Sequence, residues 1–255
     1  MEHASLIPNV SGPDQSGLLY FCTTRIGGSS SGERASLNLG TNTGDDPLQV
    51  QANRQRLRDV LGAEPVWLQQ VHGTDVLDAD QDVLPDEPRL FDAAVTTRSD
   101  RVLAILTADC LPVVVWDERA SVVGVAHAGW RGLQAGVLAR MMALIKQRRP
   151  QAQQWRAWIG PAISQPCFEV GQEVFDAFVQ ADPANRPFFI AGQQAGKWQA
   201  DLSGMAARQL ELLCPGDIQV YFSQLCTYTE SERFYSYRRS PQTGRQATIA
   251  RLTSP

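Results

Sequence analysis

The middle of the chain contains three short apolar runs rich in β-branched residues, at residues 102–106, 112–116 and 121–126. Because these runs are apolar almost throughout, rather than alternating with polar residues, they are typical of strands buried on both faces. Strands of this kind need helices or a second sheet to cover them. The sequence therefore predicts a mixed α/β (α+β) fold in which mixed β-sheets are flanked by helices.

Helical patterns supply the covering layer. Asp46 followed by Pro47 predicts the start of one helix, and Gly62 predicts its end. The side chains that we expect on its buried face are Leu48, Leu57, Val60 and Leu61. A second helical repeat spans residues 133–145 and is followed by basic residues, which the carboxyl end of a helix dipole favours. Further strands are predicted at residues 18–23, 66–71, 155–159, 218–222 and 248–252, and further helices at 173–180 and 201–213.

Composition and length indicate the general class of protein. The 255 residues are 43% hydrophobic and 20% charged, with no obvious linker, so we expect a single domain over residues 1–255, of which about 1–17 are loosely ordered. The net charge of −4 argues against a nucleic-acid-binding protein. The start of the chain lacks the pattern of a secretory signal, and the most apolar stretch is too short to span a membrane. We therefore expect a cytoplasmic protein that binds neither nucleic acid nor membranes.

Five cysteines are present, and no two of them form a CxxC pair. An odd number of thiols in a reducing compartment predicts that they stay free. They are Cys22, Cys110, Cys167, Cys214 and Cys226, and we expect Cys167 to be the one nearest the functional cleft, apart from Cys110.

The longest polar connection spans residues 78–92. It carries six acidic residues and two prolines. This composition predicts a solvated surface loop, with an active-site lid as the alternative.

Two histidines and one cysteine follow apolar strands, where the backbone is expected to leave the sheet. They are His72, Cys110 and His127. Loops converge at strand ends on a rigid support, so reactive groups are often placed there. Two imidazoles and a thiolate suit zinc, with copper as a competitor, and three protein ligands leave a fourth position open, as in catalytic sites. No local metal motif is present, so a structural role for either histidine and an inert thiol at Cys110 remain alternatives.

Several segments closely resemble the signature segments of the YfiH/laccase-domain family. They are QQVHGTDV, TADCLPVVV, AHAGWRGLQAGVL, IGPAISQPCFEVGQEV and CTYTESERFYSYRRSPQTGRQA, and they follow one another in order. The match runs from about residue 23 to residue 250, and the combination of HAGWRG with TADCLP is highly specific. The chain thus resembles this family over nearly its whole length.

This resemblance implies a bacterial purine nucleoside enzyme, which phosphorolyses adenosine, inosine and methylthioadenosine and deaminates adenosine. His72, Cys110 and His127 match the metal site of the family, so zinc, or else copper, is the implied cofactor. The implied partners are purine nucleosides and phosphate, and the implied state is a monomer or homodimer. The implied fold is distantly similar to a toxin deamidase with a Cys/His active site. One position departs from the pattern: Asn42 stands where many members carry His, so it cannot titrate near neutral pH.

Deamination and phosphorolysis require different residues. For deamination, zinc lowers the pKa of a bound water to about 7, and a nearby acid protonates the leaving nitrogen. Asp109 is the candidate catalytic acid and Asp75 a second candidate, with the orientation of a histidine or the capping of a turn as the alternative role. For phosphorolysis, the helix that Arg131 opens is predicted to favour an anion beside His127. The candidate substrate-binding residues are Arg25, Asn38, Arg131 and Arg238, whereas Arg239 is expected to be an ordinary surface residue.

Three other functions remain open at this point. A small copper-dependent polyphenol oxidase is one, although three histidines are too few for the copper centres of a laccase. A metal-free hydrolase with Cys110 as nucleophile and His127 as base is another. A protein that only binds a nucleotide is the third.

Overall fold

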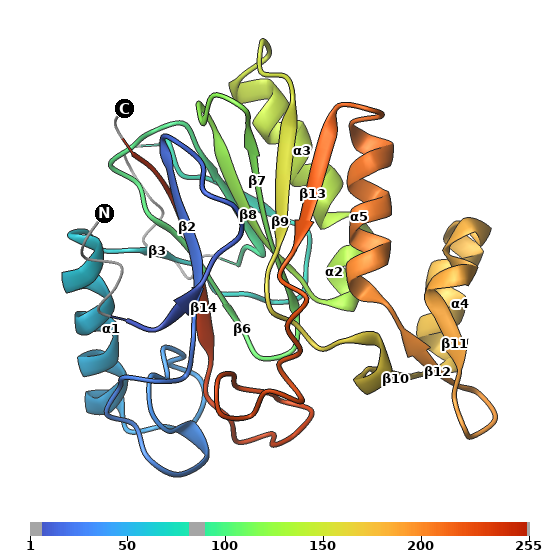
Figure 1. Cartoon of the computed structure of the whole chain (residues 1–255), viewed down its shortest axis with the longest axis horizontal. Helices are drawn as coiled ribbons and strands as arrows, with labels where there is room; N and C mark the ends of the chain where they lie inside the picture. The colour runs from blue at the N-terminus through green and yellow to red at the C-terminus, as the bar shows by residue number, and fades with distance from the viewer. Residues whose placement is uncertain (1–6, 82–89, 254–255) are drawn as a thin grey trace.

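Two β-sheets pack face to face and enclose much of the apolar core (Figure 1). The structure is a computed structural model, and it describes residues 7–81 and 90–253. Within these residues, one sheet has six strands in the order β13-β9-β7-β8-β5-β4 and the other has five in the order β1-β2-β14-β6-β3. The bounds of the first set, in that order, are Ile218–Phe222, Trp155–Ile159, Leu111–Asp117, Val123–Ala128, Ala93–Thr96 and Val76–Asp78. Those of the second are Asn9–Val10, Leu18–Thr23, Gln246–Leu252, Leu103–Thr107 and Val66–Trp67.

Helices cover the outer faces of both sheets, which gives four layers. Along β7, Val113 and Val115 pack with the helices α3 (Val137–Arg148) and α5 (Leu202–Leu213), whereas Val114 and Trp116 face the five-stranded sheet. This alternation follows from the period of two along a strand. On the far side, α1 (Pro47–Leu61) packs on the outer face of the five-stranded sheet, as Figure 1 shows. The predicted fold class, a single mixed α+β domain with mixed sheets flanked by helices, is confirmed.

The three central apolar runs form β6, β7 and β8, and the prediction that they are buried strands is confirmed. The two ends of β8 lie further along the chain than expected. His127 is therefore the fifth of its six residues rather than a loop residue after it. The strand itself thus holds the backbone of this histidine.

The helix α1 begins and ends where the sequence predicts. The Asp46 carboxylate accepts a hydrogen bond from the backbone N–H of Leu48, and Gly62 adopts the left-handed conformation that ends the helix. Its buried face was predicted partly wrongly. Val50 and Asn53 are buried with Leu57 and Leu61, whereas Leu48 is 71% exposed. Leu48 lies in the first turn, on the side of the helix away from the sheet.

The predicted strand at residues 66–71 is shorter than expected, since β3 ends at Trp67. The reason is a side chain that replaces backbone pairing. The Gln70 amide donates to the carbonyl of Leu106 at 2.7 Å and accepts from its N–H at 2.7 Å. The backbone is thereby released from the sheet shortly before His72.

The helical repeat at residues 133–145 is divided between two helices. They are α2 (Trp130–Ala135) and α3, and Gly136 lies between them with φ of 94°. This left-handed conformation suits glycine and ends the first helix after six residues. The prediction of one continuous helix was therefore wrong.

A third, small sheet was not predicted. It has the order β10-β12-β11, with bounds Glu169–Gly171, Lys197–Ala200 and Phe189–Ala191, and it packs with α4 (Gln172–Ala181) beside the main body (Figure 1). The described residues also include short 3-10 helices at Gly32–Arg34, Gln165–Cys167 and Pro183–Phe188. Strands of three or four residues carry too little periodic signal to be recognised in a sequence.

Several other expectations concern the ends and loops of the chain. Ile7 is buried and β1 pairs with β2, so the described part of the segment expected to be loosely ordered is tied to the sheet. Most of the predicted acidic loop, residues 82–89, lies outside the described residues, as do residues 1–6.

All five cysteines are described and free. No helix in the described ranges combines the length and apolar character needed to cross a membrane.

Candidate functional site

Three side chains from distant parts of the chain converge on one point. His72 lies in the loop after β3, Cys110 lies between β6 and β7, and His127 lies in β8. Their nitrogen and sulfur atoms all lie within 4.8 Å of one another, and Cys110 Sγ is 3.7 Å from His72 Nε2. His127 is buried and His72 is exposed, so the cluster extends from the core to the surface. The predicted convergence of these three residues is confirmed.

A buried carboxylate, that of Asp92, holds two parts of this cluster together. Its Oδ1 accepts hydrogen bonds from the Nδ1–H of His127 at 2.8 Å and from the N–H of His72 at 3.0 Å. Its Oδ2 accepts from the N–H groups of Val71 at 3.1 Å and Gly73 at 2.6 Å. Burial opposes ionisation of this carboxyl, but these hydrogen bonds and His127 outweigh it and lower its pKa.

The contact with Asp92 also decides which ring nitrogen of His127 is available. Because Nδ1 donates to the carboxylate, the lone pair of the neutral ring is on Nε2, which faces the cluster. The backbone N–H of His127 donates to the Asp92 carbonyl at 2.7 Å, so both the ring and the strand are fixed by the same residue.

The backbone around the cluster is tightly constrained. His72 and Asp109 both have positive φ, 59° and 89°, a conformation that is unusual for residues other than glycine. At Gly129, an added Cβ would lie 2.7 Å from His72 Cδ2 and 3.3 Å from Cys110 Sγ. At Gly132, it would lie 2.8 Å from the carbonyl oxygen of Gly73. The start of α2 therefore packs against the His72 loop at distances that only glycine allows.

The thiol and the imidazoles influence one another's ionisation. Burial raises the pKa of the Cys110 thiol, but contacts with His127 and His72 outweigh this effect and lower it. Burial lowers the pKa of His127, but contacts with Cys110 and Asp92 outweigh this effect and raise it. The arrangement thus favours a thiolate at Cys110, which is the form that binds soft metals and the form that acts as a nucleophile.

The donor set fits a metal ion. Zinc bonds of about 2.0–2.1 Å to nitrogen and 2.3 Å to sulfur place tetrahedral ligand atoms roughly 3.3–3.6 Å apart. The separation of 3.7 Å between Cys110 Sγ and His72 Nε2 is close to that spacing. Among the described residues, no other group of His, Cys, Asp and Glu side chains meets the geometry for a metal ion. Three ligands leave a fourth position for a substrate.

Asp109, the predicted catalytic acid, is engaged with the C-terminal part of the chain. Its Oδ1 accepts from the Thr227 hydroxyl at 2.7 Å. Its Oδ2 accepts from the Ser236 hydroxyl at 2.9 Å and the N–H of Arg238 at 2.7 Å. These contacts anchor the turn that presents Cys110, and a catalytic role for Asp109 stays a prediction. Asp75 is largely exposed and pairs with Arg140 at 2.7 Å, so it orients neither histidine.

Two of the four predicted substrate-binding residues have polar groups that are already occupied. The Arg25 guanidinium donates to the carbonyls of Ala35, Ser231 and Glu33. Asn38 is fully buried, and its amide bonds to Thr43, Asp45 and the backbone of Gly40 and Arg245. In this structure, both residues connect loops rather than face an open site.

The other two predicted substrate-binding residues are exposed near the cluster. Arg131 lies two residues after Gly129, and its guanidinium lies 4.3 Å from the centre of the Trp130 ring without a hydrogen bond to any described residue. Arg238 is fixed by the bond from its N–H to Asp109, and its guanidinium donates to the carbonyl of Glu169. Arg131 thus keeps its guanidinium donors available for an anion, and Arg238 keeps those that do not bond to Glu169.

The remaining predicted positions lie elsewhere or have other partners. Arg239 donates to three carbonyls, those of Thr227, Tyr228 and Phe234, so it is a structural residue rather than an ordinary surface one. Asn42 is exposed in the turn before α1. Cys167 is close enough to Cys226 and Asp109 for their charges to interact, and its place as the cysteine nearest the cleft stays a prediction.

Two residues of the site were missed in the sequence. Asp92 stands at the end of the acidic loop, and its only local signal is its place directly before the apolar run of β5. Arg245 carries a charge that interacts with the Cys110 thiol, and its N–H donates to Asn38 at 2.9 Å. It lies directly before β14, whose first residue pairs with the last residue of β6.

Known proteins are similar to this chain in sequence and in fold. The family model described as multi-copper polyphenol oxidoreductase laccase matches residues 19–253. A purine nucleoside phosphorylase of Pseudomonas aeruginosa is 41% identical over 230 residues, which are 90% of this chain and 91% of that protein. The purine nucleoside phosphorylase YfiH of Escherichia coli is 41% identical over 239 residues, 93% of this chain and 95% of that protein.

Solved structures agree with this result. A Neisseria meningitidis protein has a TM-score of 0.89 and 38% identity, and the match covers 97% of this chain and 99% of that one. The hypothetical protein YfiH of Bacillus licheniformis has a TM-score of 0.82 and 29% identity, covering 92% and 93%.

We predict that Asp92→Asn weakens zinc binding about 10- to 100-fold, the usual effect of losing a partner of a metal-binding histidine. An amide has only one accepting oxygen. The NH₂ group of the variant side chain would therefore face other donors, either the N–H groups of Val71 and Gly73 or that of His72, and those hydrogen bonds would be lost. Competition with a chelator measures the affinity. Asp75→Asn is the matched control and should bind zinc like the wild type. An unchanged affinity in Asp92→Asn would contradict the role of the carboxylate.

Proposed function

The chain belongs to the family described as multi-copper polyphenol oxidoreductase laccase, and within this family we propose that it is a purine nucleoside phosphorylase that also deaminates adenosine. The proposed substrates of phosphorolysis are adenosine, inosine and methylthioadenosine, and the proposed compartment is the cytoplasm. The observation that carries the proposal is the convergence of His72, Cys110 and His127 in a chain whose relatives bear the name purine nucleoside phosphorylase.

The proposed metal ligands are His72 Nε2, Cys110 Sγ and His127 Nε2. A bound zinc ion, or copper as the alternative, would supply Lewis acidity at the open fourth position. Three histidines in the whole chain are too few for a multicopper centre, which argues against laccase-type oxidation despite the family's description. The role of Asp92 is to hold the His127 ring and the His72 loop so that their lone pairs converge.

In phosphorolysis, an oxygen of phosphate forms a bond to C1′ of the ribose while the bond from C1′ to the purine nitrogen breaks. The products are ribose 1-phosphate and the free base, which takes up a proton. Phosphate carries negative charge throughout, so it needs cationic groups at the mouth of the site. Arg131 and Arg238 are exposed and are our candidates for this role, whereas Arg25 and Asn38 are occupied by internal contacts.

In deamination, water replaces the amino group at C6 of adenosine, which gives inosine and ammonia. The leaving nitrogen must gain a proton. Asp109 is our proposed proton carrier: its carboxylate, directly before Cys110 in the chain, would take a proton from the attacking water and pass it to the leaving nitrogen. The two hydroxyls that donate to it, those of Thr227 and Ser236, connect it to the C-terminal segment. The competing role for Asp109 is to position Arg238 through its backbone N–H.

A second candidate function is supported by the order of contacts among Cys110, His127 and Asp92. A thiol next to an imidazole, with a carboxylate on the far ring nitrogen, is the arrangement of a cysteine hydrolase. In that function, Cys110 would attack the substrate directly and no metal would be required.

Metal removal separates the two functions. We predict that protein dialysed against a chelator loses both phosphorolysis and deamination, and that added zinc restores them, because the three ligands cannot polarise a substrate without an ion. Product formation from adenosine, with and without phosphate, is followed by mass spectrometry. Full activity of the metal-free protein would favour the cysteine hydrolase and contradict the metal site.

A substitution at Arg131 separates the two reactions. We predict that Arg131→Ala lowers phosphorolysis of inosine about thirty- to a hundredfold, because a charge-assisted contact with phosphate is lost. Deamination of adenosine involves no phosphate and should change little. The two rates are measured side by side on the same preparation.

Arg140→Ala is the matched control for this experiment, since it removes an exposed arginine that pairs with Asp75. It should leave both reactions unchanged. Equal losses of both reactions in Arg131→Ala would mean that this residue holds the nucleoside or the loop rather than phosphate.

A further inference from the structure

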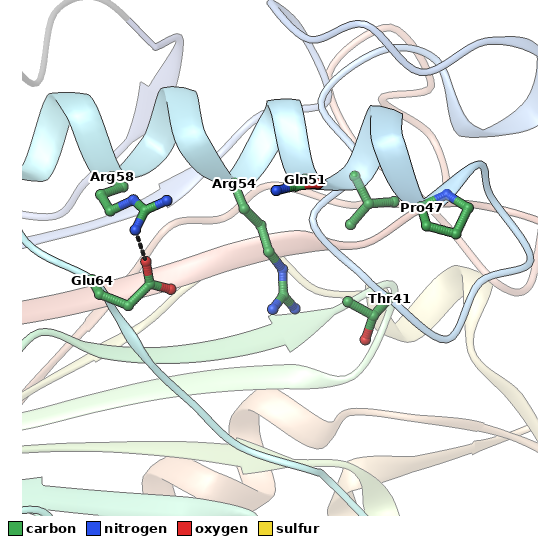
Figure 2. Close-up of a pocket in the computed structure, with 7 residues that line it drawn as sticks. Thr41, Pro47, Gln51, Arg54, Arg58 and Glu64 are labelled. Atoms are coloured by element: carbon green, nitrogen blue, oxygen red, sulfur yellow. Dashed lines mark ion pairs between the residues drawn. The ribbon is translucent and has the colours of Figure 1, made fainter.

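A cavity lies on the side of α1, apart from the His-Cys-His cluster. It has a volume of about 250 Å³ and is lined by Thr41, Pro47, Val50, Gln51, Arg54, Arg58 and Glu64 (Figure 2). None of these residues belongs to the proposed active site. The lining combines two guanidinium groups, one carboxylate and an apolar wall from Pro47 and Val50.

The carboxylate in this cavity is already neutralised. Glu64 Oε2 lies 3.3 Å from Arg58 Nη1, and Glu64 Oε1 accepts a hydrogen bond from Trp67 Nε1 at 3.0 Å. Figure 2 shows the Arg58–Glu64 pair on one side of the cavity. The charge of Arg54 is therefore left without a matching anion.

Arg54 is held in place by its other atoms. Its Nε donates to the carbonyl of Leu39 at 2.9 Å, and its guanidinium lies 4.0 Å from the centre of the Trp67 ring. Among residues 7–81 and 90–253, no carboxylate pairs with Arg54, and no acceptor bonds to its Nη1 or Nη2. Figure 2 shows these two nitrogens extending between Glu64 and Thr41. The side chain thus presents a fixed edge with two N–H donors to the cavity.

The unpaired charge of Arg54 indicates a missing partner, because the side chain is partly buried. Burial lowers the pKa of Arg54, with Glu64 opposing the effect, but a guanidinium remains charged at neutral pH. Buried charges are normally paired, and Arg54 is partly buried. The planar edge of an arginine is suited to two parallel hydrogen bonds with a phosphate or carboxylate. Around it, Thr41 and Gln51 add a hydroxyl and an amide at the rim of the cavity.

We propose that the cavity beside α1 binds a small oxyanion, a phosphate or carboxylate group, on the Nη1 and Nη2 edge of Arg54. The rest of the ligand lies against Pro47 and Val50, and its size is limited by the cavity. The site is separate from the proposed active site. One backbone residue links the two regions: Leu39 accepts from Arg54 Nε and donates its N–H to the carbonyl of Arg245.

The Trp67 indole N–H is a local reporter for this site, because it donates to Glu64 in the cavity wall. Its NMR signal is assigned with Trp67→Phe. Inorganic phosphate and succinate are titrated separately into the whole protein, with sodium chloride at matched ionic strength as the reference. We expect a saturable shift with at least one of the two anions, and the anion that causes it identifies the chemistry of the ligand.

Arg54→Gln should weaken this binding at least about tenfold, because the charge-assisted contacts are lost. Arg56→Gln, on the same helix but outside the cavity, should bind like the wild type, and so should Arg131→Ala in the proposed active site. Gln51→Trp provides a second variant, which keeps Arg54 but fills the cavity and should also lose binding. An unchanged shift in folded Arg54→Gln, or no saturable shift of wild-type Trp67 with either anion, would overturn the proposal.

Discussion

The buried carboxylate of Asp92 accepts hydrogen bonds from three consecutive backbone N–H groups, those of residues 71–73, and from the imidazole of His127. The loop that carries His72 has left its sheet and pairs with no strand among the described residues at this point. The carboxylate supplies that partner. The same group sets the tautomer of His127, so one buried charge determines the direction of two of the three proposed ligands.

The remaining ligand depends on the packing of the two sheets. Cys110 lies in the turn between β6 of one sheet and β7 of the other, so its position is fixed by both. Asp109 holds this turn through Thr227, Ser236 and the backbone of Arg238, from a segment more than a hundred residues away. The cluster is therefore assembled from rigid strands and two buried carboxylates. Such preorganisation lets His72, the most exposed ligand, meet the others without a large rearrangement.

Much of this architecture could be predicted from local patterns. The apolar runs predicted the strands β6 to β8. Asp46–Pro47 predicted the start of α1, and Gly62 predicted its end. Each of these patterns involves only residues that are close in sequence. The convergence of the three ligands was expected from their positions near strand ends together with the family resemblance, although His127 lies within its strand. Asp92 could not be found in this way, since its partners lie 19–21 and 35 residues away in the chain. For the same reason, Arg25 and Asn38 were expected at the substrate, although their partners are carbonyls and side chains of neighbouring loops.

X-ray absorption spectroscopy of the zinc-loaded protein tests the central claim most directly, because it reports the atoms bound to the ion itself. Our account predicts two imidazole nitrogens at about 2.0–2.1 Å and one sulfur at about 2.3 Å, with a light atom in the fourth position. In Cys110→Ala, the sulfur contribution should disappear. A zinc ion without a sulfur neighbour in the wild-type protein, or a sulfur that persists in Cys110→Ala, would contradict the assignment of His72, Cys110 and His127 as one metal site.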